Sequence, residues 1–312
     1  MSIWHIYGGN RLTGSTRVQG AKNAVLPIMA ASVLSGGETV LHNVPDLRDV
    51  TTTLRILQHL GCTAVRDGDT VRIDSRGMHC DFIPHALMRE LRSSVIFLGA
   101  ILARFGTARL SMPGGCELGP RPVNLHLDAL RALGAEVTER GGDIICRAHA
   151  LQGRRILLPF PSVGATENAM LAACAAAGET VICNAAREPE IADLQCYLRK
   201  LGADISGAGT STVTVGGFRP RPFVEHTIMP DRIVAATILC AAAACGGEVE
   251  LQDVDPAHFS TVLDSLSEAG CAIITAASAV RLTSDGQLTA PRPVVTQPYP
   301  GFPTDAQPPL MA

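Results

Sequence analysis

One pattern recurs four times along this chain: an Ala- and Leu-rich helix, a Gly turn, a short apolar strand, then a second helix and another strand. The second helix ends at Gly61, Gly134, Gly202 and Gly270, at intervals of 73, 68 and 68 residues. A period of about 70 residues is too long for a short solenoid repeat and predicts a duplicated supersecondary module. Copies of that module must therefore make up the fold.

The first copy indicates what one module contains. A helix over 24–34 is apolar nearly all round, which predicts that it is buried, and Gly36 and Gly37 end it. Residues 38–42 then predict a strand, and 49–60 an amphipathic helix that opens on an acidic residue. Two alternating runs about Asp67-Gly68 predict a hairpin. With one more strand leading in, the module reads βαβαββ, an α/β (α+β) unit.

The chain is long enough for two domains. We expect several modules to pack around shared central helices, because each module leaves a face that needs covering. Three prolines in FRPRPFVEHTIMPD predict a boundary near residue 229. Residues 1–18 read as a hairpin without helices that completes a module elsewhere. The predicted domains are 19–229, with three modules, and 1–18 plus 230–312, which is incomplete.

Composition excludes several classes of protein. A net charge of −3 gives no reason to expect a nucleic-acid or membrane partner. The N-terminal residues lack signal-peptide features, and the longest apolar run, 233–247, is shorter than the roughly 20 residues that span a bilayer. We therefore expect a cytoplasmic protein. None of the ten cysteines forms a CxxC pair, so nine are interpreted as core residues, including Cys174, Cys240 and Cys245. No metal-ligand cluster is recognisable.

Chemistry is expected where the copies differ. Only the second copy carries the loop PGGCELGPRP, which contains Cys116. Arg121 follows this cysteine and Arg92 precedes it, and nearby arginines lower a thiol pKa and bind anions bidentately. The alternative is a surface loop with an incidental cysteine.

Two further positions stand out. Lys22 and Asn23 open a helix, where a lysine opposes the helix dipole, so a bound anion is one explanation and a solvated lysine the other. Asp305 lies where a fifth copy would start. Its carboxylate is either a general base or a helix N-cap, and the residues alone favour the cap.

Seven ordered segments resemble the UDP-N-acetylglucosamine enolpyruvyl transferase family, from about residue 8 to the last residue: GAKNAVLP, LRSSVIFLGAILARFG, PGGCELGPRPVNLH, PSVGATEN, NAAREPEI, PDRI and PGFPTD. The resemblance implies two domains of three βαβαββ units each, an inside-out α/β barrel with the ligand cleft between them. The related 5-enolpyruvylshikimate-3-phosphate synthases share that fold but lack the PGGC loop.

The resemblance also assigns roles. Lys22 and Asn23 would contact phosphoenolpyruvate, with Arg121 holding its phosphate. Cys116 would protonate the methylene carbon, and Asp305 would take the proton from the sugar 3-hydroxyl. The nucleotide-sugar site would be lined by Arg92, Arg121, Pro122, Val123, Asn124, Leu125, Ser162, Val163, Gly164 and Asp305. The family usually has Asp at the position of Asn124. No cofactor or metal is implied.

The implied reaction moves the enolpyruvyl group of phosphoenolpyruvate to the 3-hydroxyl of UDP-N-acetylglucosamine and releases phosphate, the first committed step toward peptidoglycan. In this family fosfomycin alkylates the loop cysteine. Family members continue for about one and a half further modules, so we expect a truncated product or a fragment gene, whose missing part would supply helices for residues 1–18. The alternative is a non-catalytic nucleotide-sugar-binding homologue.

Overall fold

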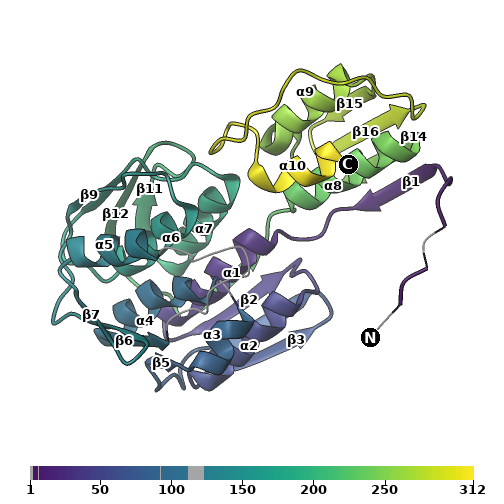
Figure 1. The fold of residues 1–312 in the computed structure, drawn as a ribbon. Helices are drawn as coiled ribbons and strands as arrows, with labels where there is room; N and C mark the ends of the chain where they lie inside the picture. Colours follow the sequence, from purple (N-terminus) through teal and green to yellow (C-terminus); the bar gives the residue numbers. More distant parts are fainter. Residues whose placement is uncertain (1–2, 6, 92, 112–122) are drawn as a thin grey trace. The chain divides into compact units, whose positions relative to one another are not determined.

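The computed structural model describes residues 3–5, 7–91, 93–111 and 123–312 (Figure 1). The chain divides into two compact units, a larger one of residues 20–229 and a smaller one of residues 1–19 and 230–312. Among the described helices, none is both long and apolar enough to cross a membrane.

The first module of the larger unit takes its leading strand from far along the chain. Its sheet has the order β13-β2-β4-β3, with β13 parallel to β2 and the other neighbours antiparallel. Its elements are β13 (Phe223–Thr227), α1 (Lys22–Ala31), β2 (Glu38–His42), α2 (Arg48–His59), β3 (Thr63–Asp67) and β4 (Thr70–Asp74). The predicted helices, strand and hairpin of this copy are all present.

The second and third modules repeat this order. Their sheets run β5-β6-β8-β7 and β9-β10-β12-β11. The second contains β5 (Phe82–Ile83), α3 (His85–Glu90), a 3₁₀ turn (Ser94–Ile96), α4 (Phe97–Phe105), β6 (Thr107–Ser111), α5 (Asn124–Ala132), β7 (Glu136–Arg140) and β8 (Asp143–Arg147). The third contains β9 (Arg155–Leu157), α6 (Val163–Ala173), β10 (Thr180–Cys183), α7 (Pro189–Leu201), β11 (Ala203–Ser206) and β12 (Thr212–Phe218).

The first long helices of the three modules form the centre of the larger unit. Helix α4 packs against both α1 and α6, and eight of the ten residues of α1 are buried (Figure 1). A buried helix surrounded by other helices needs apolar residues on every side, which explains the absence of a polar face in the sequence. At Gly99 the helices approach so closely that a Cβ would lie 2.5 Å from the carbonyl oxygen of Asn168.

The smaller unit contains one complete module. Its sheet has the order β1-β14-β16-β15, with β1 parallel to β14. The elements are β1 (Leu12–Arg17), α8 (Arg232–Cys245), β14 (Gly247–Gln252), a 3₁₀ turn (Pro256–Phe259), α9 (Ser260–Glu268), β15 (Ala272–Ala276), β16 (Ala279–Ser284), a 3₁₀ turn (Thr304–Ala306) and α10 (Gln307–Met311). Only half of the fourteen residues of α8 are buried.

The prediction of an N-terminal hairpin was wrong. Residues 12–17 form the single strand β1. This strand pairs with β14 and is the leading strand of the fourth module. Its partner β14 and the helix α8 that contacts it both belong to this chain. Alternation of apolar and polar residues predicts a strand but does not identify its neighbour.

Two leading strands are therefore exchanged between distant parts of the sequence. β1 precedes the first module but pairs with the fourth, whereas β13 follows the third module and pairs with the first. The crossing segments are tied together, because Ala21 N–H donates to Met229 O at 2.7 Å and Asp231 N–H donates to Gln19 O at 2.9 Å. The proline-rich segment near residue 229 thus contains a paired strand as well as a boundary.

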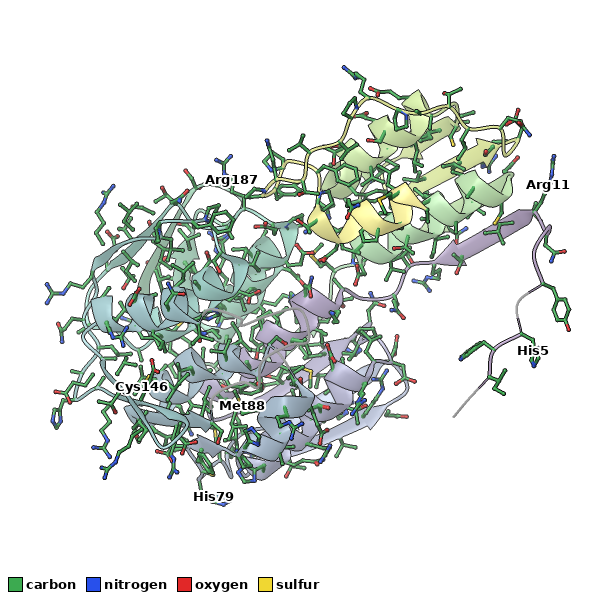
Figure 2. All side chains as sticks on the ribbon, in the orientation of Figure 1. His5, Arg11, His79, Met88, Cys146 and Arg187 are labelled. Atoms are coloured by element: carbon green, nitrogen blue, oxygen red, sulfur yellow. The ribbon has the colours of Figure 1, made fainter. Side chains whose placement is uncertain are left out.

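The interpretation of the cysteines as core residues holds for six of the nine that the structure describes. Cys146, labelled in Figure 2, is one of the buried thiols, and burial raises its pKa to about 12. The interpretation was wrong for Cys196 and Cys245, which are exposed, and Cys80 is half-buried. Cys245 ends α8, a helix with only seven of its fourteen residues buried, so Ala-rich sequence around a cysteine did not guarantee burial there.

Candidate functional site

Lys22 and Asn23 are the first two residues of α1. Among the described residues no side chain caps this end of the helix, and no acidic residue lies in its first turn, so the positive end of the helix dipole is not offset by its own helix. The Lys22 Nζ atom lies 3.9 Å from Asp49 Oδ2 on α2, and both side chains are more than a third exposed. An exposed pair at that distance contributes little to stability, so the lysine is not explained by this contact alone.

The starts of α5 and α6 lie side by side. Val123 occupies the N-cap position of α5, and Asn124 and Leu125 are its first two residues. Ser162 caps α6, where its Oγ accepts a hydrogen bond from Ala165 N–H at 3.4 Å. The side chain of His126 and the glycine at position 164 bring these two starts together.

His126 joins the two helix starts. A Cβ at Gly164 would lie 2.7 Å from His126 Cε1, so only glycine allows the imidazole to approach α6 this closely. The His126 Nδ1 atom also lies 2.7 Å from Nδ2 of Asn168 on α6. The structure therefore brings together residues 123–125 and 162–164, which the family resemblance assigned to one site. Neither His126 nor Asn168 was predicted from the sequence, although an asparagine inside an Ala-rich helix is a usable signal.

Carboxyl groups gather at the starts of α6 and α7. Glu167 on α6 is 6% exposed, and its pKa is raised well above the usual range by burial, with Glu190 and Glu188 adding repulsion. Glu190 is also buried, whereas Arg187, three residues before it, is exposed (Figure 2). The segment NAAREPEI thus places acidic groups inside the larger unit, close to the start of α6.

Asp305 belongs to the smaller unit. It lies in the 3₁₀ turn Thr304–Ala306, where Pro303 holds the N-cap position, and Ala306 precedes α10. Interpreting Asp305 as a helix cap was therefore wrong, and its side chain is exposed. In the same unit Asp231 of the PDRI segment does cap a helix, since its Oδ1 accepts from Ile233 N–H at 2.9 Å and Val234 N–H at 3.1 Å.

Four of the predicted site residues lie outside the described residues: Arg92, Cys116, Arg121 and Pro122. The loop PGGCELGPRP belongs to this part of the chain. The described neighbours of that loop are Ser111, which ends β6, and Val123, which precedes α5.

Comparison with known proteins gives a consistent result. A family model described as EPSP synthase (3-phosphoshikimate 1-carboxyvinyltransferase) matches residues 6–312. A UDP-N-acetylglucosamine 1-carboxyvinyltransferase 2 of Caldanaerobacter subterraneus subsp. tengcongensis is 46% identical over 312 residues, which is all of this chain and 75% of the relative. The corresponding protein 1 of Symbiobacterium thermophilum is 49% identical over 98% of this chain and 71% of its own length.

Solved structures show the same fold. The enolpyruvyl transferase NikO from Streptomyces tendae matches with a TM-score of 0.85 and 26% identity, over 98% of this chain and 73% of NikO. An EPSP synthase from Acinetobacter baumannii matches with a TM-score of 0.67 and 20% identity, over 97% and 69% of the two chains, which shows the fold alone. With a family model that matches nearly the whole sequence and relatives that share almost half of its residues, the chain belongs to the EPSP synthase family of enolpyruvyl transferases.

Proposed function

We propose that this chain transfers the enolpyruvyl group of phosphoenolpyruvate to the 3-hydroxyl of UDP-N-acetylglucosamine, with release of phosphate. The observation that carries the proposal is the identity of 46–49% to two relatives named UDP-N-acetylglucosamine 1-carboxyvinyltransferase, across 98–100% of this chain. The PGGC loop, which the shikimate enzymes lack, favours a nucleotide sugar as the acceptor. The proposal includes action in the cytoplasm and a place in peptidoglycan synthesis.

The binding part of the proposal relies on helix N-termini. The first N–H groups of a helix have no partner in the helical ladder and attract anions. Lys22 adds a positive charge at the start of α1, and residues 162–164 form the start of α6. Both substrates are multiply anionic, so these two positions suit phosphate groups. Arg121 and Arg92 would add bidentate contacts.

The chemical part needs an acid and a base. Asp305 would take the proton from the sugar 3-hydroxyl while that oxygen bonds to the C2 carbon of phosphoenolpyruvate, and Cys116 would donate a proton to its methylene carbon. The product of this addition is a tetrahedral ketal. Loss of a proton from the methyl group and of phosphate from C2 then restores the double bond and leaves the enolpyruvyl ether.

Phosphate release tests the reaction. The purified chain is incubated with both substrates, and inorganic phosphate is measured beside the variant Cys116→Ala. We expect release that requires both substrates and falls to background in the variant. Equal release from the two proteins would contradict the proposed role of Cys116.

The second candidate function is that of a nucleotide-sugar-binding homologue without catalysis. The chain spans 71–75% of the length of these two relatives. Calorimetric binding of UDP-N-acetylglucosamine without phosphate release would support this second candidate.

Fosfomycin gives an independent readout of the thiol: we expect a covalent mass shift on the peptide containing Cys116. An unmodified peptide at saturating drug would argue against Cys116 as the proton donor.

A further inference from the structure

The side chain of Asn168 is inserted into a neighbouring helix. Its Nδ2 atom donates to Val95 O at 2.9 Å, and its Oδ1 atom accepts from Gly99 N–H at 2.7 Å. Residues 95 and 99 are four apart, so these are the two groups that an uninterrupted α-helix joins directly. The amide bridges them where the 3₁₀ turn Ser94–Ile96 gives way to α4. A side chain in this position sets the geometry of the helix start.

These two bonds fix the orientation of the amide. The carbonyl of Val95 can only accept and the amide of Gly99 can only donate, so Oδ1 and Nδ2 of Asn168 cannot be exchanged. The second hydrogen of Nδ2 is then available to His126 Nδ1, which lies 2.7 Å away. That ring nitrogen must accept, and a neutral imidazole with an accepting Nδ1 carries its proton on Nε2. The tautomer of His126 follows from the network.

Asn168 is fully buried, with no exposed surface, so its amide is shielded from water, whereas His126 is half-buried. Loss of the donor to Val95 O would remove a hydrogen bond from the carbonyl of a buried residue, and such a loss carries a desolvation cost. The same imidazole packs against Gly164. One amide therefore connects the start of α4, the start of α5 through His126, and the start of α6.

We propose that Asn168 is a positioning residue for the nucleotide-sugar site. It fixes the positions of residues 123–125 and 162–164 relative to each other by holding His126 as the neutral Nε2–H tautomer. The proposal rests on the proposed function only for the identity of the ligand. The arrangement of the helix starts and the tautomer are independent of that function.

The tautomer is measured first, on the unmodified chain with ¹⁵N-labelled histidine. The variant His126→Gln identifies the signals of His126 among those of the nine histidines. We expect at neutral pH the shift of an unprotonated nitrogen for Nδ1 and of a protonated nitrogen for Nε2. The opposite pattern, or a doubly protonated ring, would overturn the proposal without any effect on the proposed function.

The isosteric variant Asn168→Asp removes both donors and keeps an acceptor for Gly99 N–H. We expect the His126 proton to move to Nδ1, backbone amide signals to shift at Leu125 and Gly164, and calorimetric binding of UDP-N-acetylglucosamine to weaken about tenfold or more. Gln58→Glu is the matched control, because it also turns an amide into a carboxylate and loses one donor, to Ala64 O, in the first module. It should leave all three readouts unchanged.

Three results separate the two proposals. If Asn168→Asp binds the nucleotide sugar as tightly as the unmodified chain, the positioning role is wrong and the proposed function stands. If neither the unmodified chain nor any variant binds the nucleotide sugar, the proposed ligand is wrong. The amide shifts at Leu125 and Gly164 then still decide whether Asn168 positions the two helix starts. If Asn168→Asp does not fold, Asn168→Ser, which is small and can donate one bond, is measured in the same way, and an unchanged tautomer and affinity would refute the role.

Discussion

The carboxylate of Asp193 on α7 ties strand β13 to the third module of the larger unit. Its Oδ1 atom accepts from His226 Nε2 at 2.9 Å, and its Oδ2 atom accepts from Met229 N–H at 3.2 Å. His226 is 4% exposed and its ring packs edge-on against Tyr197, whose hydroxyl lies 2.9 Å from Thr39 Oγ1. The leading strand of the first module is thus fixed by a residue of the third module.

Removal of this carboxylate should destabilise the larger unit. Asp193→Ala leaves the imidazole and a backbone N–H buried without their acceptor, and we expect a loss of about 3 kcal/mol in the free energy of unfolding. Hydrogen exchange of the β13 amides localises the effect. The control is Asp128→Ala, because Asp128 pairs with Arg131 on the surface, where an exposed pair contributes about 0.5 kcal/mol. Equal losses in the two variants would contradict the prediction.

Gly99 should tolerate no side chain. A Cβ there would lie 2.5 Å from Asn168 O, a backbone atom in a packed helix, so Gly99→Ala must push α4 away from α6. We expect destabilisation of about 1–3 kcal/mol in urea unfolding. Gly217→Ala is the control, since no atom of the described residues lies within 4 Å of a Cβ at that position. A neutral Gly99→Ala would show that the two helices can separate without cost.

Glu167 should make stability depend on pH. Burial and its acidic neighbours raise the pKa of this carboxyl in the folded state above its ordinary value of 4.5. The folded state therefore holds a proton that the unfolded state releases, so its contribution is complete below about pH 4.5 and is lost as pH rises through the folded pKa.

The variant Glu167→Gln removes that proton and keeps the shape of the side chain. We expect the unfolding free energy of the variant, minus that of the unmodified chain, to rise by at least about 1 kcal/mol from pH 5 to pH 8. Urea unfolding at both values checks this. Glu139→Gln, on an exposed position of β7, should show no such gain. Parallel pH dependence in the unmodified chain and Glu167→Gln would rule out Glu167 as the source.

Thiol labelling should follow burial. Burial raises the pKa of Cys174 to about 12 and that of Cys62 to about 11, so both thiols remain protonated and shielded at pH 8. Cys196 and Cys245, in contrast, are exposed. Iodoacetamide at pH 8, followed by peptide mass measurement, should modify the two exposed thiols and spare the two buried ones until urea unfolds the chain. Early modification of Cys174 would show that the centre of the larger unit opens readily.

The sequence determined the local elements well. The strand predicted over 38–42 matches β2, and the hairpin about Asp67-Gly68 matches β3 and β4. Periodic apolar residues and glycine turns act over a few neighbours, so they can be recognised without knowledge of the rest of the chain. The family could also be identified, because its seven segments are ordered and specific.

Only the tertiary structure decided which strands pair and which side chains meet. The exchange of β1 and β13 joins residues more than 180 positions apart, and the hydrogen bond between Asn168 and His126 joins neighbouring helices of different modules. The spacing of residues in a sequence carries no record of such contacts. They arise because buried polar groups must find partners wherever packing places them. The sequence thus determined the module and the family, whereas packing between modules decided how the described parts of the site are held.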